Sequence, residues 1–78
     1  MDSKKIIGKA IKDKRVKVKK TQTQVSEDTG ISRSYLSDME NGRYMPSVET
    51  LIKLASYLEL DLNFLLEMTE IQVKTKEE

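Results

Sequence analysis

Two short segments that each carry a start signal meet at a single glycine in the first half of the chain. Thr21-Gln22-Thr23-Gln24 is a capping box, in which a Thr hydroxyl and a Gln side chain satisfy backbone amides at the start of a helix. The segment it opens, residues 22–29, ends at Gly30, because helices often stop at a left-handed glycine. Ser32 is a second N-cap and opens a segment through Glu40. The pattern predicts two short helices joined by a tight turn.

Side-chain size within residues 22–41 fits two helices that cross at close range. Four apolar positions would close the small core between them: Val25, Ile31, Leu36 and Met39. Ser26 is small at the point where the second helix crosses the first, and Asn41-Gly42 ends the second helix. Thr29 is the exception, because a larger aliphatic side chain would fill that position better. Residues 22–41 therefore predict a helix-turn-helix unit.

Helical spacing of apolar residues continues on both sides of this unit. A first helix begins after Asp2 or Ser3 as N-cap. Its apolar stripe runs through Ile7, Ile11 and Val18, and Lys14 interrupts it. A further helix begins after Ser47. Its apolar stripe consists of Val48, Leu51, Ile52, Ala55 and Leu58, widened by Leu54.

A last short helix and a polar tail complete the predicted architecture. Asp61 caps this helix, whose inward face consists of Leu62, Leu65 and Leu66. A length of 78 residues suits one domain. We expect an all-α domain over residues 1–70 and a polar C-terminal tail over residues 71–78.

The composition excludes several classes of function. The chain has no Cys and no His, so no thiolate or imidazole can hold zinc, and the commonest general base is missing. No apolar run approaches the roughly 20 residues that span a bilayer. No apolar stretch follows the basic N-terminus as it would in a signal peptide. We therefore expect a cytoplasmic protein that is not an enzyme and that uses no metal, no cofactor and no membrane.

The formal net charge of +1 conceals two opposed blocks. Residues 1–20 contain nine basic and two acidic residues, whereas residues 21–78 contain five basic and eleven acidic residues. A basic helix beside an acidic body can bind polyanions. A solvated lysine face explains the same pattern, so the charge block by itself is weak evidence for a partner.

Residues within the helix-turn-helix unit and on both sides of it carry a family resemblance. They are Ile7-Gly8, Arg15, Thr21-Gln22, Gly30-Ile31-Ser32, Tyr35-Leu36, Glu40-Asn41-Gly42-Arg43, Pro46-Ser47 and Glu49-Thr50-Leu51 through Leu54-Ala55. The segment from Ile7 to Leu66 resembles the Cro/CI-type (XRE-type) family, to which many phage repressors belong. The resemblance implies a five-helix lambda-repressor-like bundle that binds operator DNA as a dimer. The chain departs from the family pattern at Lys14, Lys19 and Lys20, where an aliphatic residue, a glycine and another aliphatic residue are usual.

The resemblance also implies which residues read bases. The helix after Ser32 would enter the major groove with its N-terminal end. The exposed residues there are Ser32, Arg33, Ser34, Ser37 and Asp38. Arg33 is the strongest candidate, because a guanidinium can donate to both O6 and N7 of one guanine. Asp38 could accept from the N4 amino group of cytosine, or it could orient Arg33 or Arg43.

A second set of residues is expected to contact phosphates, which fix the register on DNA without reading sequence. This set consists of Gln22, Thr23, Asn41, Arg43, Tyr44, Lys17, Lys19 and Lys20. Gln22 and Thr23 stand at the start of a helix, where free N–H groups favour an anion. Asn41 can also serve as a plain C-cap, and a solvated corner explains the three lysines equally well.

The C-terminal helix carries a second apolar face, made of Phe64, Met68 and Ile71. Two apolar faces on one short helix suggest a symmetric dimer, although Phe64 could instead fold back on the first helix. We expect a dimeric, sequence-specific regulator of transcription that acts as a repressor. The alternatives are a restriction–modification controller and a protein-binding module on the same fold, such as an antitoxin or adaptor. An apolar exposed face on the helix after Ser32 would favour a protein partner.

Overall fold

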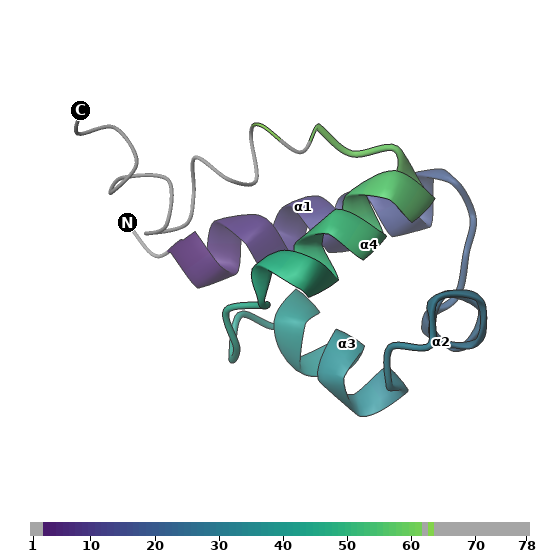
Figure 1. Ribbon diagram of the computed structural model, residues 1–78, viewed down its shortest axis with the longest axis horizontal. Coiled ribbons are helices and arrows are strands. Elements are labelled where there is room, and N and C mark those ends of the chain that lie inside the picture. The colour runs from purple at the N-terminus through teal and green to yellow at the C-terminus, as the bar shows by residue number, and fades with distance from the viewer. Residues whose placement is uncertain (1–2, 62, 64–78) are drawn as a thin grey trace.

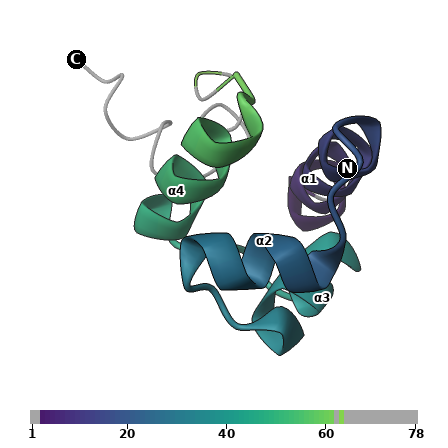
Figure 2. The same cartoon turned by 90° about the vertical axis from the view of Figure 1, so that its right-hand side faces the viewer.

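The computed structural model describes residues 3–61 and 63, and this part of the chain is all-α. Its four helices are α1 (Ser3–Lys17), α2 (Gln22–Thr29), α3 (Arg33–Glu40) and α4 (Val48–Leu58). Figure 1 shows α1 and α4 on one side of the molecule and α2 and α3 on the other. The view in Figure 2 agrees, with α2 and α3 as a lower layer and α1 and α4 standing above it. The helix-turn-helix unit thus presents its outer face away from α1 and α4.

The start and stop signals of α2 and α3 lie where the sequence predicts them. The Thr21 hydroxyl accepts from the Gln24 amide at 3.0 Å, and the Gln24 side chain accepts from the Thr21 amide at 2.8 Å. Gly30 has a φ of 81°, and its amide donates to the Ser26 carbonyl. The Ser32 hydroxyl accepts from the amide of the third helical residue at 3.0 Å. These local bonds hold the two helices at a fixed turn.

Thr29 is better suited to the turn than the sequence suggests. Its hydroxyl donates to the Val25 carbonyl at 2.7 Å and accepts from the Ile31 amide at 3.2 Å. The side chain therefore satisfies the first amide after the turn, which would otherwise lose its partner as Ile31 becomes buried. The expectation that a larger aliphatic residue would fill this position better did not include these bonds, which an aliphatic side chain cannot make.

The hydrophobic core draws on all four helices and on the turn. Its residues are Ile7, Ile11, Val25, Ile31, Leu36, Met39, Leu51, Leu54, Ala55 and Leu58. Two predicted core positions are wrong. Val18 follows the end of α1 and is exposed, and Ile52 is 49% exposed on the flank of α4. The buried stripe of α4 runs through Leu51, Leu54, Ala55 and Leu58 instead, because the helix is rotated toward Leu54.

At the end of α1, the chain departs from the family pattern and its backbone takes an unusual conformation. Lys19 has a φ of 62°, in the left-handed region that favours glycine. Its amide donates to the Val16 carbonyl at 2.9 Å, and the Lys20 amide donates to the Arg15 carbonyl at 3.0 Å. These two bonds form a Schellman motif, which normally places glycine at the Lys19 position. Lys19 is therefore strained, but the backbone makes the same turn that a glycine would make at this position.

Gly8 allows α1 to cross α3 at very short range. A Cβ atom at Gly8 would lie 2.2 Å from the carbonyl oxygen of Met39 and 3.1 Å from that of Glu40. No side chain fits into that space. The close crossing brings α1 against the C-terminal end of α3, where Met39 and Glu40 lie.

Several predictions fall on residues outside the described part of the chain. They concern the fifth helix with Leu62, Leu65 and Leu66, the dimer residues Phe64, Met68 and Ile71, and the tail over residues 71–78. At the edge of the described part, the Asp61 carboxylate accepts from the Asn63 amide at 3.0 Å. Within residues 3–61 and 63, no helix is long and apolar enough to cross a membrane.

Candidate nucleic-acid interface

A shallow depression on the outer face of α3 gathers four of the five predicted base-reading residues. It is lined by Arg33, Ser34, Ser37 and Asp38 of α3 and by Gln22 of α2. Arg33 and Ser34 are exposed, while Ser37 and Asp38 are half-buried. The depression thus presents a guanidinium, two hydroxyls, a carboxylate and a carboxamide on one side of the molecule.

Ser32 is the predicted base-reading residue that does not line this depression. Its hydroxyl caps α3 by accepting from the Tyr35 amide. The oxygen that would meet a base is therefore engaged in the helix start, and the cap accounts for the presence of serine here.

Asp38 is paired with Arg43 in the segment that follows α3. A guanidinium nitrogen of Arg43 donates to the Asp38 Oδ1 atom at 3.1 Å, and the Arg43 amide donates to the Asp38 carbonyl at 2.9 Å. Of the alternatives for Asp38, the ion pair with Arg43 is the one present in the structure. The pair neutralises a carboxylate that would otherwise repel phosphate.

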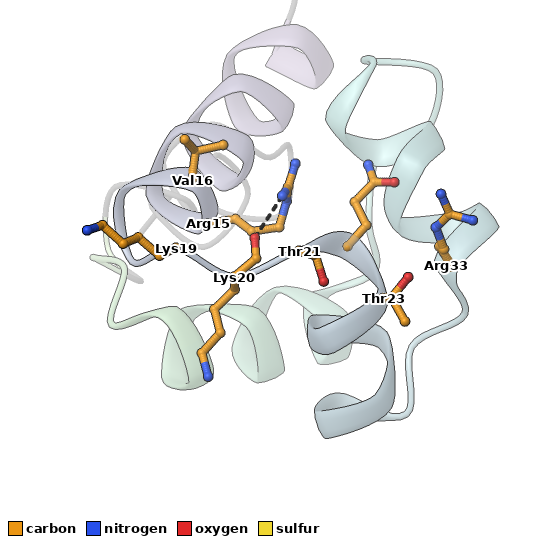
Figure 3. Close-up of a pocket in the computed structure, with 8 residues that line it drawn as sticks. Arg15, Val16, Lys19, Lys20, Thr21, Thr23 and Arg33 are labelled. Atoms are coloured by element: carbon orange, nitrogen blue, oxygen red, sulfur yellow. Dashed lines mark hydrogen bonds between the residues drawn. The ribbon is translucent and has the colours of Figure 1, made fainter.

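A second depression lies at the start of α2 and meets the first one at Gln22 and Arg33. Its lining also includes Arg15, Val16, Lys19, Lys20, Thr21 and Thr23. Figure 3 shows Thr23 near Arg33, whereas the side chains of Lys19 and Lys20 extend away from Arg33. The Lys20 ammonium lies 5.7 Å from the centroid of the Tyr57 ring on α4. Lys17 is exposed but lines neither depression.

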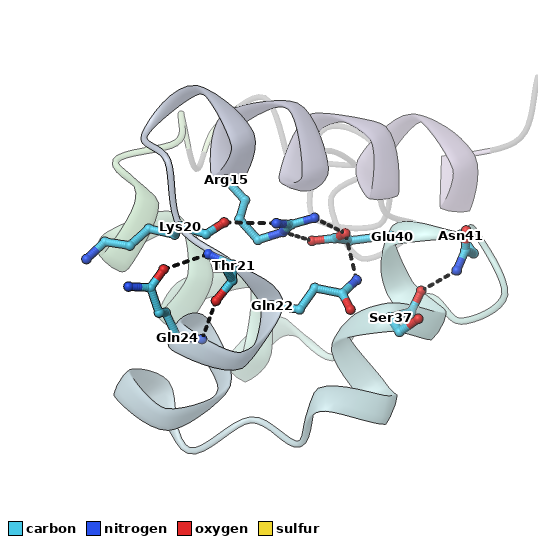
Figure 4. A network of polar contacts seen from close by, with 8 residues as sticks. All are labelled: Arg15, Lys20, Thr21, Gln22, Gln24, Ser37, Glu40 and Asn41. Carbon is cyan, nitrogen blue, oxygen red and sulfur yellow. Dashed lines mark hydrogen bonds and ion pairs between the residues drawn. The ribbon is translucent and has the colours of Figure 1, made fainter.

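A polar network under the two depressions ties α1, α2 and α3 together (Figure 4). Arg15 donates to both oxygens of Glu40, at 2.6 and 2.9 Å, and a third guanidinium bond reaches the Lys20 carbonyl at 2.9 Å. The carboxamide nitrogen of Gln22 donates to the Glu40 Oε1 atom at 3.0 Å. The Glu40 side chain is only 3% exposed, and that of Arg15 is 11% exposed.

This network was not predicted, although Arg15, Gln22 and Glu40 all belong to the residues that carry the family resemblance. Hydrogen bonding to Glu40 raises the pKa of Arg15 above its ordinary value, and burial opposes this effect. The guanidinium therefore stays charged across the accessible pH range. Because Gln22 gives its N–H to Glu40, its carboxamide oxygen is fixed in direction toward the α3 side.

Asn41 and Tyr44 occupy the segment after α3. Asn41 is the C-cap of α3, and its side chain donates to the Ser37 carbonyl at 2.9 Å. Tyr44 is 53% exposed and meets the ring of Tyr35 edge-on, with 6.0 Å between centroids. The C-cap reading of Asn41 is confirmed, and the hydroxyl-bearing ring of Tyr44 is accessible.

Comparison with known proteins agrees with this geometry. A family model described as Helix-turn-helix matches residues 11–65. The chain belongs to the helix-turn-helix family. It is of the Cro/CI (XRE) type, which confirms the resemblance seen in the sequence. This helix-turn-helix family consists of DNA-binding transcriptional regulators, so the expectation of a non-enzymatic protein is also confirmed.

Individual relatives of this helix-turn-helix chain include phage proteins. It is 53% identical over 73 residues to the "ImmF control region 10 kDa protein" of Bacillus phage phi105, an alignment that covers 94% of this chain and 79% of that protein. It is 42% identical over 57 residues to the "Immunity repressor protein" of the same phage, covering 73% of this chain and 40% of the relative. It is 32% identical over 57 residues to the "Cryptic phage CTXphi transcriptional repressor RstR" of Vibrio cholerae, covering 73% of this chain and 51% of the relative. No solved structure gives a significant match.

Proposed function

We propose that this protein represses transcription by binding a palindromic operator in the cytoplasm as a homodimer, with the first turn of α3 in the major groove. The observation that carries the proposal is the depression formed by Gln22, Arg33, Ser34, Ser37 and Asp38. It combines hydrogen-bond donors and acceptors on one accessible helix face, which is what the edges of base pairs require. The names of the phage repressors to which the chain is similar support the same role.

Arg33 is assigned to a guanine in each half-site. It lies in the first turn of α3, it is exposed, and it stands where the two depressions meet. Its guanidinium can donate to O6 and N7 of the same base, and such a pair contributes about 1–3 kcal/mol of discrimination. Ser34 and Ser37 are assigned to neighbouring base edges, because a hydroxyl can donate or accept.

Phosphate contacts are assigned to the rim of the two depressions. Gln22 and Thr23 are the first two residues of α2. Within the described residues, the backbone N–H group of neither residue donates a hydrogen bond. Amides at a helix start favour an anion. Arg43, Asn41 and Tyr44 would hold the backbone beyond the end of α3, and Lys17, Lys19 and Lys20 would meet flanking phosphates. Uniform loss of affinity on all sequences is the expected signature of these contacts.

We assign the domain to residues 1–70. The homodimer is assigned to a fifth helix at the C-terminal end of this domain, through Phe64, Met68 and the adjoining Ile71. Doubling the half-site raises affinity, because the second contact becomes intramolecular. Two bound α3 helices would then lie about 34–36 Å apart, which is one turn of DNA. Phe64→Asp is expected to give monomers in analytical ultracentrifugation. A dimer that persists in this variant would show that other residues form the interface.

The exposed face of α3 favours DNA over a protein partner. Its accessible side chains are polar, whereas the large exposed apolar side chains of the described part lie on other segments, namely Val16, Val18, Tyr44, Met45 and Ile52. An antitoxin or adaptor that used α3 would need apolar surface there.

Selection of bound fragments from random duplex DNA, at a stated salt concentration, tests the proposal directly. We expect an enriched site with two-fold symmetry and half-sites about one helical turn apart. Binding that selects no sequence, or a site without symmetry, would contradict it. Repeating the selection with Phe64→Asp separates the contribution of the dimer from that of the single domain.

A further inference from the structure

Asp38 is an acidic residue on a surface that has to approach a polyanion. Its side chain is 33% exposed and lines the α3 depression together with Ser34 and Ser37. An unpaired carboxylate at that place would weaken every DNA complex by repelling phosphate. Arg43 removes this difficulty, because its guanidinium, 65% exposed, pairs with the Asp38 Oδ1 atom at 3.1 Å.

The pair is also held by the backbone. The Arg43 amide donates to the Asp38 carbonyl at 2.9 Å, so the turn after α3 keeps both side chains on the same side. Within the described residues the ion pair uses only Oδ1. Oδ2 is therefore available as an acceptor, and Arg43 fixes the direction in which the carboxylate faces.

A carboxylate can only accept hydrogen bonds, and this restricts the base it can meet in the major groove. Guanine presents two acceptors, and thymine presents one acceptor beside a methyl group, so neither base offers the carboxylate a donor and their acceptor oxygens repel it. Adenine presents its N6 donor beside the N7 acceptor, which lies close enough to repel the second oxygen. Cytosine presents the N4 amino donor without a neighbouring acceptor on the same base.

We infer that Asp38 selects cytosine at one base pair of each operator half-site by accepting a hydrogen bond from the N4 amino group, with Arg43 as its positioning residue. The inference rests on the proposed function, because it requires α3 to lie in the major groove. It gives the half-site a second specified base besides the guanine assigned to Arg33.

The test is a selection from random duplex DNA with the wild-type chain and Asp38→Asn at one salt concentration. A carboxamide can bond to N6 and N7 of adenine together. Asp38→Asn should therefore change the preferred base at one position of each half-site from cytosine to adenine, with other positions unchanged. In competition binding, the wild type should prefer cytosine there by roughly 5- to 150-fold, the usual cost of one mismatched base pair.

Asp13→Asn is the matched control, because it removes the same charge from an exposed pair with Lys9 on α1. It should leave the selected bases unchanged. If the wild type selects a defined site and Asp38→Asn selects the same base at every position, the inference is wrong while the proposed function stands. If the wild type selects no sequence, both are wrong.

Arg43 is tested by the same readout. Arg43→Ala should reduce the cytosine preference as well as the overall affinity, because Asp38 loses its partner. Arg43→Lys keeps a cation within reach of Asp38 and should restore part of the cytosine preference. A cytosine preference that is as strong in Arg43→Ala as in the wild type would show that Arg43 does not position Asp38.

Discussion

Arg15 on α1 and Glu40 at the end of α3 form a two-pronged salt bridge across the place where the two helices cross. Glu40 also accepts from Gln22 at the start of α2, so one carboxylate connects three helices. Because Gln22 and α3 together line the candidate DNA surface, the salt bridge fixes the parts of that surface relative to each other. Its contribution is to orientation as much as to stability.

Glu40→Gln should lower the free energy of unfolding by about 3 kcal/mol, because it leaves the Arg15 guanidinium largely buried without an opposite charge. Urea denaturation followed by circular dichroism measures the change. Asp13→Asn, which breaks the exposed Lys9–Asp13 pair, is the control and should cost no more than about 0.5 kcal/mol. Equal effects of the two variants would mean that the buried Arg15–Glu40 pair contributes no more to stability than the exposed Lys9–Asp13 pair.

Lys19→Gly should stabilise the protein by about 0.5–1 kcal/mol. Relief of the left-handed strain at a φ of 62° exceeds the entropy that glycine loses on folding. A rise of several degrees in the midpoint of thermal unfolding is expected for a domain of this size. Lys20→Gly is the control, since its backbone is not left-handed and glycine there should only destabilise. A lower midpoint for Lys19→Gly would contradict the argument.

Gly8→Ala should destabilise the protein by about 1–3 kcal/mol or more, because the new Cβ would lie 2.2 Å from the Met39 carbonyl oxygen. A loss of stability is informative here, because replacing glycine by alanine within a helix normally stabilises it by about 1 kcal/mol. Chemical denaturation measures the effect, and Lys9→Ala on the exposed side of α1 should be close to neutral. Stabilisation by Gly8→Ala would exclude the close crossing of α1 and α3.

Arg33→Ala should weaken binding to the selected operator by about 1–3 kcal/mol and relax the preference at one base pair of each half-site. Fluorescence anisotropy with the selected duplex and with single-base variants measures both effects. Lys53→Ala removes one positive charge from the exposed side of α4 and serves as the control. An equal loss of affinity on all sequences would assign Arg33 to the phosphates instead.

The Tyr57 hydroxyl donates to the Asp28 carboxylate, and this bond raises the pKa of Tyr57 above its ordinary value near 10. The folded state holds the phenol proton more tightly, so the stabilisation is complete below pH 10 and is lost as the pH rises through the folded-state pKa. Ultraviolet titration of tyrosinate should show a late-titrating tyrosine that Tyr57→Phe removes. Asp28→Asn should return it toward the ordinary value; an unchanged titration in that variant would exclude the bond.

Local signals in the sequence were sufficient to predict the helix-turn-helix unit. The capping box at Thr21, the left-handed Gly30 and the caps at Ser32 and Ser47 act within one turn of helix, so residue type and spacing decide them. The same reasoning placed Arg33 and its neighbours on an exposed helix face. It erred at Ile52, because helical spacing gives the rough width of an apolar stripe but not the rotation of the helix against its neighbours. It erred at Val18, because α1 ends at Lys17 and the helical stripe does not reach that residue.

Only the tertiary structure decided which distant residues meet. Arg15 and Glu40 are 25 positions apart, and their pairing depends on the close crossing that Gly8 permits. The choice of Arg43 rather than Arg33 as the partner of Asp38 depends on the turn after α3. The sequence by itself thus determined the short helices, their ends and the exposed face of α3, since these depend on bonds between near neighbours. The polar network and the orientation of the site arise from helix packing, which no local pattern encodes.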